Sequence, residues 1–207
     1  MMIGLLVVVL AYVLGGIPFG YLLVKLKTGT DVRTAGSGNI GATNVLRTNG
    51  TVAGVATLLL DMGKGYLAVW LAGRFTAGAD GPSSLWMSAA ALAVMAGHAY
   101  PVFLKFHGGK AVACFVGAFL CLTPLAMVAI LVVFLGVVIG TRQVSMGSIV
   151  AAAVFPLGVW LIQKPPLVVV ASAVAAGAFI IYRHRSNLER LSRGTESTFD
   201  FRGGRSR

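Results

Sequence analysis

Charged side chains are scarce in this 207-residue chain. Asp, Glu, Lys and Arg together make up 11% of the residues, whereas 57% are hydrophobic. A soluble domain carries about 25% charged residues, so the composition excludes an ordinary soluble protein. Apolar runs long enough to cross about 30 Å of hydrocarbon recur along the chain, and they are continuous rather than alternating, which disfavours a β-barrel. The sequence predicts an all-α, multi-pass integral membrane protein that forms a single polytopic domain over residues 1–207.

Acidic side chains are scarcer still, with six Asp and Glu against 17 Lys and Arg and a net charge of +11. Carboxylates this few and scattered do not supply the clustered oxygen ligands of a divalent cation, so we predict no metal and no other cofactor. A basic chain often binds nucleic acid. Here, however, the positive charge that multi-pass proteins keep in their cytoplasmic loops explains the excess, and we predict no nucleic-acid partner.

Cysteine is limited to Cys114 and Cys121. Seven residues of helix span about 10 Å, which is too far for a disulfide. The N-terminal stretch "MMIGLLVVVLAYVLGG" has neither a basic segment before its apolar run nor a clear cleavage site, unlike a signal peptide. We therefore expect it to remain as the first membrane helix.

The apolar runs and the basic loops together predict a topology. Helices are expected over Met2 to Val24, Thr51 to Ala72, Leu85 to Leu104, Met146 to Ile162 and Leu167 to Tyr182. Residues 111–140 can form one helix or two around Thr123-Pro124. Two helices, Ala111 to Leu122 and Leu125 to Gly140, place 14 of the 17 Lys and Arg on one side, as the positive-inside rule requires.

This arrangement has about seven transmembrane helices, with the N-terminus outside and the C-terminus in the cytoplasm. The helix over residues 111–122 is about 18 Å long, so it must be partly buried in protein or lie where the bilayer is thin. Residues 196–207 are expected to form a mobile polar tail.

The stretch "AGSGNIGATN", residues 35–44, has the Gly-x-Gly-x-x-Gly spacing of a dinucleotide-binding loop. Asp61 even lies about 20 residues further on, as that fingerprint requires. The context is wrong, because a membrane helix precedes the block where a strand should lie. We interpret the block as an anion-binding loop at the membrane surface, with Thr43 or Asn44 capping a short helix over residues 45–47 whose N-terminus also faces the anion.

Three further polar segments fall on the predicted cytoplasmic side: "GHAYPVFLKFHGGK", "TRQVS" and "YRHRSNLERLSRGTE". Gly108 and Gly109 let the backbone approach an anion and Lys110 adds charge, although a Lys at this position also serves as an interface anchor. His98, near an interface, is more often structural.

Two pairs of polar residues lie three apart. Asp61 and Lys64 lie within a membrane helix, where charges usually face the protein interior. They form either a structural ion pair or a means of orienting the active-site helix. His184 and Asn187 share one face if the last helix continues through them, and both can bind a polar head group.

The segments "GSGNIGATNVLR", "GHAYPVFLKFHGGKAVA" and "YRHRSNLERLSRGTE" resemble the three motifs of the bacterial membrane acyl-phosphate:glycerol-3-phosphate acyltransferases. "LLLDMGKGY" and "VSMGSIV" extend the resemblance over most of the chain. Ala111 and Cys114 stand where that family usually has Gly and Thr, and His107 stands where Lys is common. Ala111 is expected to stiffen the loop, Cys114 removes a hydroxyl, and His107 lowers the local charge.

The resemblance implies transfer of a fatty acyl group from acyl phosphate to the 1-hydroxyl of glycerol 3-phosphate, which gives lysophosphatidic acid and phosphate. It implies residence in the bacterial inner membrane, a cytoplasmic active site, and functional coupling to the enzyme that makes acyl phosphate from acyl carrier protein. The catalytic residues it implies are Ser37, Lys110 and His184. The substrate-binding residues it implies are Gly36, Gly38, Asn39, Gly41, Thr43, Asn44, Arg47, His98, Gly108, Gly109, Ser145 and Asn187.

The residues near Ser37 in sequence include no base that activates it as a nucleophile, and Glu189, five residues after His184, is the nearest carboxylate in sequence to a cytoplasmic His. We therefore predict no dedicated carboxylate–His base and no covalent acyl-enzyme; the donor's phosphate accepts the proton. A transporter for an anionic solute is the main rival, although it favours a midplane site and inverted repeats. A CDP-alcohol-type transferase needs clustered carboxylates for a metal, which this chain lacks.

Overall fold

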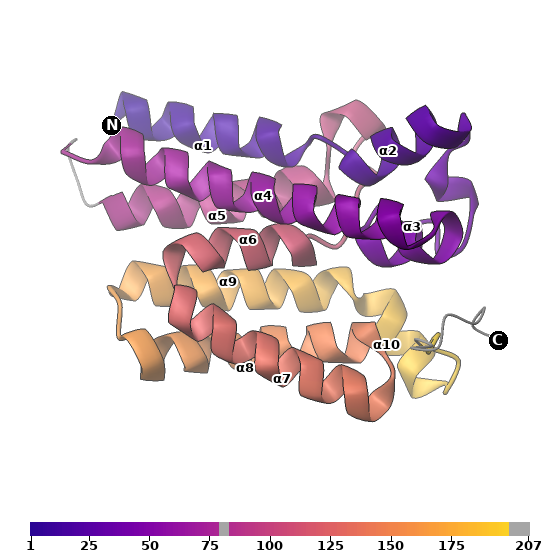
Figure 1. Cartoon of the computed structure of the whole chain (residues 1–207). Helices are drawn as coiled ribbons and strands as arrows, with labels where there is room; N and C mark the ends of the chain where they lie inside the picture. Colours follow the sequence, from indigo (N-terminus) through magenta and orange to yellow (C-terminus); the bar gives the residue numbers. More distant parts are fainter. Residues whose placement is uncertain (79–82, 199–207) are drawn as a thin grey trace. The chain divides into compact units, whose positions relative to one another are not determined.

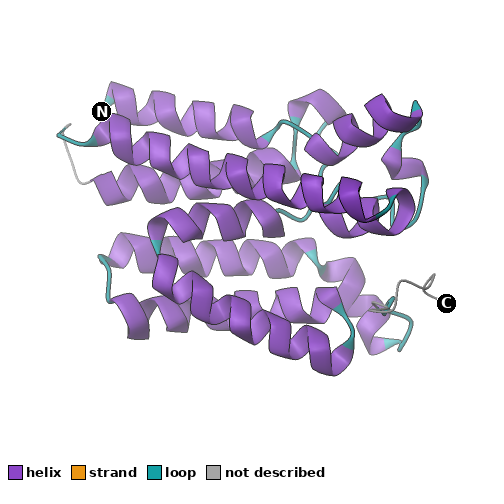
Figure 2. Ribbon diagram, in the orientation of Figure 1, coloured by secondary structure: helices purple, strands orange, loops and turns teal. Residues whose placement is uncertain are grey.

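Helices form all the regular secondary structure of the described residues, 1–78 and 83–198, in this computed structural model (Figure 2). The predicted all-α class is therefore confirmed for this part of the chain. The helices group into two compact units, Met1–Leu122 and Thr123–Arg207 (Figure 1). A single domain over the whole length stays a prediction.

Helix α4 is the central element of the first unit, where it packs on α1, α3, α5 and α6 (Figure 1). Short 3₁₀ helices, η1 and η2, connect the longer elements. The bounds in this unit are α1 Met2–Gly15, α2 Phe19–Thr28, η1 Val32–Thr34, α3 Ala42–Asn49, α4 Thr51–Thr76, α5 Ser83–Ala99, η2 Val102–Leu104 and α6 Val112–Leu122.

Glycines allow the helices of this unit to pack backbone against backbone. A methyl group at Gly65 of α4 would collide with the carbonyl of Cys114 in α6, and one at Gly117 of α6 would collide with the carbonyl of Met62. Small residues at such crossings are typical of membrane helix pairs, in which close van der Waals packing drives association.

Two of the predicted helices are interrupted. Instead of one helix from Met2 to Val24, α1 ends at Gly15 and α2 begins after Pro18, because proline lacks the N–H that a continuous helix needs. Together α1 and α2 still give an apolar stretch of 27 residues, Met2–Thr28. In the same way α5 ends at Ala99, since Pro101 disfavours helical backbone in the residue before it.

The described residues of the second unit form four helices. Their bounds are α7 Pro124–Thr141, α8 Val144–Gln163, α9 Leu167–Arg183 and α10 Arg185–Ser192. Helix α8 packs between α7 and α9. The predicted division of residues 111–140 into two helices is confirmed, because α6 ends at Leu122 and Pro124 starts α7.

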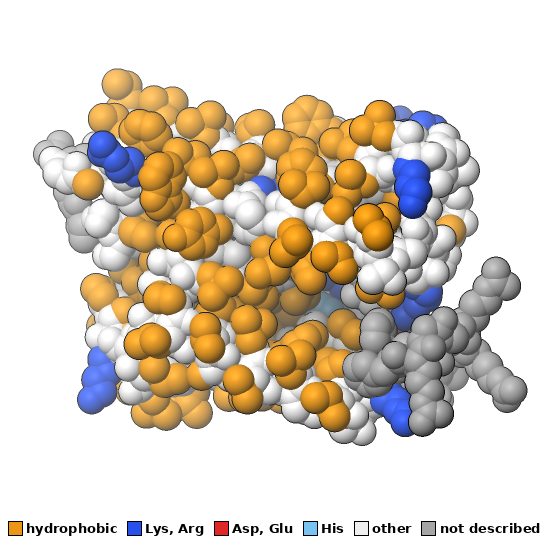
Figure 3. Space-filling model, in the orientation of Figure 1, with side chains coloured by type: hydrophobic (Ala, Val, Ile, Leu, Met, Phe, Trp, Pro, Cys, Tyr) orange, Lys and Arg blue, Asp and Glu red, His pale blue; other side chains and the backbone are white. Residues whose placement is uncertain are grey.

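Five helical stretches of the described residues are long and apolar enough to cross a membrane, and six are if α9 and α10, bent by 57°, count as one span. Helix α6, with 11 residues, is shorter. Seven spans and their orientation therefore stay a prediction. Hydrophobic side chains cover much of the face that Figure 3 shows. Leu59, Leu135 and Leu161 are each more than half exposed, as lipid-facing residues are.

Candidate functional site

The glycine block forms the loop of residues 35–41 between η1 and α3. Helix α3 begins at Ala42 and its N-cap is Gly41, which makes no side-chain cap bond. The prediction that Thr43 or Asn44 caps this helix is therefore wrong. Asn44 lies in the first turn of α3 and is buried, because its side chain turns back into the loop.

The amide of Asn44 holds the loop in shape. Its Oδ1 accepts the backbone N–H of Ser37 at 2.8 Å. Its Nδ2 contacts three carbonyl oxygens, those of Asn39 at 2.8 Å, Ala35 at 3.1 Å and Val32 at 3.4 Å. Gly36 has a φ of 59°, and a side chain there would collide with Asn44 Oδ1. Glycine is therefore required where the loop passes closest to this amide.

Part of the loop backbone is engaged within the loop. Three N–H groups donate to loop or α3 acceptors: Ser37 to Asn44 Oδ1, Gly38 to the Ala35 carbonyl and Gly41 to Asn39 Oδ1. The side chains of Ser37, Thr43 and Arg47 are exposed. The loop therefore presents hydroxyl and guanidinium groups on a rigid backbone, a combination that suits a phosphate.

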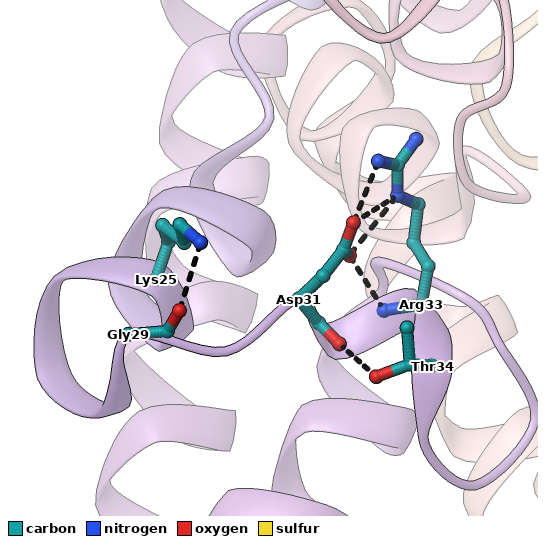
Figure 4. Close-up of polar contacts among 5 residues, drawn as sticks. All are labelled: Lys25, Gly29, Asp31, Arg33 and Thr34. Carbon is teal, nitrogen blue, oxygen red and sulfur yellow. Dashed lines mark hydrogen bonds and ion pairs between the residues drawn. The ribbon is translucent and has the colours of Figure 1, made fainter.

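Arg33, just before the loop, is paired with Asp31 (Figure 4). Its Nη2 lies 2.7 Å from Asp31 Oδ2 and its Nε lies 3.0 Å from Oδ1. The hydrogen bond from Arg33 lowers the pKa of Asp31 below its usual value, and Asp31 in turn raises the pKa of Arg33. The guanidinium also lies 5.3 Å from the ring centre of Tyr21. Arg33 is therefore committed to local structure, in contrast to the exposed Arg47.

The HGGK turn, residues 107–110, lies against the end of α5. The N–H groups of Gly108 and Gly109 donate to the carbonyls of Ala99 and His98, each at 3.1 Å. A side chain on Gly108 would collide with the His98 carbonyl, and one on Gly109 would collide with His98 Nε2. Both glycines are needed for this close approach. Ala111 follows with a left-handed φ of 62°, a conformation that favours glycine.

A buried ionic cluster lies beneath the turn. Lys64 Nζ is 2.7 Å from Asp61 Oδ1, and His98 Nδ1 is 3.6 Å from the same oxygen. Lys64 also donates to the carbonyl of Ile17, at the break between α1 and α2, at 2.7 Å. The predicted Asp61–Lys64 ion pair is confirmed. The contact with His98 places a carboxylate beside a histidine across two helices, which the spacing of these residues in sequence does not predict.

An apolar hollow lies beside the same break. Its volume is about 390 Å³, and it is lined by Ile17, Pro18, Tyr21, Leu22, Phe103 and Leu104. Tyr21 connects the hollow to the polar residues before the glycine loop, because the Arg33 guanidinium lies over its ring. An apolar cavity of this size suits part of an acyl chain.

The second unit has a polar cluster centred on Glu196. Its Oε1 accepts hydrogen bonds from Ser145 Oγ and Asn187 Nδ2, both at 2.7 Å, and its Oε2 accepts one from Arg190 Nε at 2.7 Å. Burial opposes ionisation, but the hydrogen bonds from Ser145, Asn187 and Arg190 hold the pKa of Glu196 below its usual value. The structure thus brings Ser145 and Asn187 together through Glu196, the first residue of the predicted mobile tail.

His184 lies at the bend between α9 and α10. The last helix does not continue through it, but His184 and Asn187 are both buried, and the Asn187 N–H donates to the His184 carbonyl at 2.8 Å. His184 Nδ1 is 2.8 Å from the Ile180 carbonyl. Since a carbonyl only accepts, Nδ1 donates this hydrogen bond and holds the ring against the last turn of α9.

The predicted site residues therefore fall into separate groups. In the first unit, the loop residues gather around Asn44 and the HGGK turn lies on His98. In the second unit, Ser145 and Asn187 meet at Glu196. Glu196 was missed as a site residue, although it is the last residue of the third resembling motif, "YRHRSNLERLSRGTE". The rest of the predicted mobile tail, residues 199–207, lies outside the described residues.

Comparison with known proteins gives one consistent family. The profile of the glycerol-3-phosphate acyltransferase family matches residues 5–194. A glycerol-3-phosphate acyltransferase of Geobacter sulfurreducens is 45% identical over 195 residues, which cover 94% of this chain and 97% of the relative. One of Trichlorobacter lovleyi is 48% identical over 189 residues, which cover 91% and 94%.

Solved structures give the same result. A crystal structure of PlsY (YgiH), described as an integral membrane glycerol 3-phosphate acyltransferase in its glycerol 3-phosphate form, superposes with a TM-score of 0.87. It is 40% identical, and the match covers 95% of this chain and 96% of that one. The form of PlsY with lysophosphatidic acid has a TM-score of 0.84 and is 38% identical over 95% of each chain.

Proposed function

Because this chain belongs to the glycerol-3-phosphate acyltransferase family, we propose that it transfers a fatty acyl group from acyl phosphate to the 1-hydroxyl of glycerol 3-phosphate. The products are lysophosphatidic acid and inorganic phosphate, in the first acylation of phospholipid synthesis. The observation that carries the proposal is the glycine loop held around Asn44, which presents the exposed Ser37 and Arg47 beside the membrane helices.

Ser37, Gly38 and Asn39 of the loop bind the acyl-phosphate head together with Lys110 of the HGGK turn. The apolar hollow beside the α1–α2 break receives part of the acyl chain, since each buried methylene stabilises the complex by about 0.8 kcal/mol. Its apolar lining, and its connection through Tyr21 to the residues before the loop, support this role.

Glycerol 3-phosphate is bound by hydroxyl, amide and cationic side chains. Some of these contact the substrate, and others position those that do: Asn44 holds the loop, and Glu196 holds Ser145 and Asn187. The set comprises Thr43, Asn44, Arg47, Ser145, His184 and Asn187.

The reaction needs no acyl-enzyme. The 1-hydroxyl oxygen attacks the acyl carbon, the bond from that carbon to the phosphate oxygen breaks, and the leaving phosphate accepts the hydroxyl proton. Positioned cations and hydroxyls stabilise the charge that develops at the carbonyl. The exposed position of Ser37, with no base near it in sequence, supports this route. Trapping of a stable acyl-Ser37 adduct in the parent protein would contradict it.

The protein resides in the bacterial inner membrane with its N-terminus outside and its active site facing the cytoplasm. The predicted cytoplasmic loops and tail hold 14 of the 17 Lys and Arg, which supports this orientation. On the cytoplasmic side it receives acyl phosphate from the enzyme that makes it from acyl carrier protein. Labelling of single cysteines placed at residues 27 and 164 with a membrane-impermeant reagent in intact cells tests the orientation.

The activity is tested on purified protein in lipid mesophase or detergent without added metal. Palmitoyl phosphate and glycerol 3-phosphate are supplied, and released phosphate and lysophosphatidic acid are measured, with palmitoyl coenzyme A as the competing donor. We expect turnover with acyl phosphate alone, its loss in Lys110→Ala, and its retention in the control Lys105→Ala. Absence of product, together with glycerol-phosphate uptake into proteoliposomes, would favour a transporter instead.

A further inference from the structure

Three side chains with metal-binding atoms meet in the interior of the first unit: Asp61 of α4, His98 of α5 and Cys114 of α6. One such atom of each lies within 4.8 Å of the other two. The three residues are 1%, 4% and 0% exposed. We propose that Asp61, His98 and Cys114 form a binding site for a thiophilic divalent cation of the zinc class.

The separations suit such an ion. Zinc bonds of about 2.0–2.3 Å in a tetrahedral arrangement place neighbouring ligand atoms roughly 3.4–3.7 Å apart. Asp61 Oδ1 and His98 Nδ1 are already 3.6 Å apart. No two of the three ligand atoms are more than 4.8 Å apart. A side-chain movement of about 1 Å brings them within the separation that a bound zinc ion requires.

His98 has an unused coordinating atom. Its Nδ1 is buried and has no hydrogen-bond partner among the described residues. Buried polar atoms are nearly always hydrogen-bonded, so this nitrogen, 3.6 Å from Asp61 Oδ1, is available to coordinate a cation. The close approach of Gly109 to Nε2 fixes the ring in this orientation.

The set of donors determines the class of cation. A thiolate, an imidazole and a carboxylate together favour zinc and similar metals, whereas magnesium and calcium prefer oxygen ligands alone. Binding breaks the S–H bond of Cys114 and releases its proton to solvent. The thiolate and the carboxylate then balance the two positive charges of the ion, and a water molecule can complete the tetrahedron.

Lys64 limits the affinity of the site. Its ammonium lies 2.7 Å from Asp61 Oδ1, where it occupies a carboxylate oxygen and repels an incoming cation. Removing this charge therefore strengthens binding, while removing any of the three ligands weakens it. The two groups of substitutions have effects of opposite sign, which a general loss of folding cannot produce.

The claim concerns binding and does not depend on the proposed acyltransferase activity. The full chain in detergent is titrated with Cd²⁺ under anaerobic conditions, and thiolate-to-cadmium charge-transfer absorption and equilibrium dialysis are measured. We expect binding of one equivalent, which Zn²⁺ displaces. In Cys114→Ser the absorption disappears and the affinity falls by more than about tenfold, whereas the matched control Cys121→Ser retains both.

The other ligands are tested with the thiol in place. His98→Gln and Asp61→Asn each lower the affinity by more than about tenfold, and Lys64→Gln raises it. Circular dichroism verifies that each variant is helical. Absorption that survives Cys114→Ser, or an affinity unchanged in both His98→Gln and Asp61→Asn, would show binding at a lone thiol or elsewhere. Either result overturns the proposal, as does weaker binding by a folded Lys64→Gln variant.

Discussion

Asn44 Oδ1 accepts the backbone N–H of Ser37 at 2.8 Å, across seven residues of sequence. The same amide contacts the carbonyls of Asn39, Ala35 and Val32 through its Nδ2. One buried side chain therefore sets the path of the backbone on both sides of Ser37. The position of the exposed Ser37 hydroxyl depends on Asn44 rather than on a cap at the start of α3.

Replacing Asn44 with alanine should release the loop. The substitution leaves the Ser37 N–H and the loop carbonyls without their buried partner, which typically costs about 1–3 kcal/mol. We expect a lower melting temperature and faster hydrogen exchange over residues 35–41, with the membrane helices unaffected. Thr43→Ala, at the exposed neighbouring position, is the stability control. Unchanged exchange in Asn44→Ala would show that the loop holds its shape without this amide.

Gly54 sets how closely α3 approaches α4. A methyl group there would lie 2.6 Å from Leu46 Cα and 2.9 Å from Leu46 N, so Gly54→Ala forces the two backbones apart. Overpacking of this kind costs about 1–3 kcal/mol, and it moves the glycine loop that α3 carries. We expect lower thermal stability together with reduced acyl transfer.

Gly63 provides a matched control in the same helix. Apart from its chain neighbours and the backbone of its own helix, a methyl group there would meet no heavy atom within 4 Å. Gly63→Ala is therefore expected to be neutral or to stabilise α4 by up to about 1 kcal/mol through helix propensity. Equal effects of the two substitutions on melting temperature would contradict the packing argument and would implicate helix propensity alone.

The sequence predicted where the helices lie better than it predicted which residues contact one another. Long apolar runs and Thr123-Pro124 determine where helices begin and end, so the two helices within residues 111–140 were predicted correctly. The sequence predicts one helix from Met2 to Val24, whereas the chain breaks at Pro18. The bend at His184 was not predicted, because no proline or glycine marks it.

Contacts between distant residues could not be predicted from spacing. The ion pair of Asp61 with Lys64 lies within one helix, and the helical repeat places residues three apart on the same face. The approach of His98 to Asp61 instead depends on how α5 packs on α4. Asn44 was expected as a cap because Asn is common there, but the chain uses its amide within the loop. Glu196 lies beyond the last helix, where polar composition alone predicts a mobile tail.

The Asp61–Lys64 pair should show strong coupling between its two partners. Each side chain is buried, and removing one partner of such a pair leaves an uncompensated charge that costs about 3–5 kcal/mol. Lys64→Met alone is therefore expected to lower the melting temperature strongly. In Lys64→Met with Asp61→Leu most of that loss is recovered, because neither charge of the pair remains. Additive losses in the double variant, measured by thermal unfolding in detergent, would show that the pair is not coupled.

Glu196 should make the stability of the second unit depend on acid pH. Its hydrogen bonds hold its folded-state pKa below the ordinary value of 4.5, so the unfolded chain binds a proton more readily than the folded one. The stabilisation by Glu196 is thus fully present above about pH 4.5 and is lost as the pH falls through the folded-state pKa.

We expect Glu196→Gln to be less stable than the parent at neutral pH, and we expect the difference in stability between the two proteins to narrow below pH 4.5. Asp31, whose pKa is also lowered, is present in both proteins, so its effect on the pH dependence of stability is the same in each and cancels in the comparison. Glu189→Gln, at an exposed position of α10, should leave the pH profile unchanged. A gap between Glu196→Gln and the parent that stays constant across the acid range would show that the Glu196 carboxylate does not hold Ser145 and Asn187 through its charge.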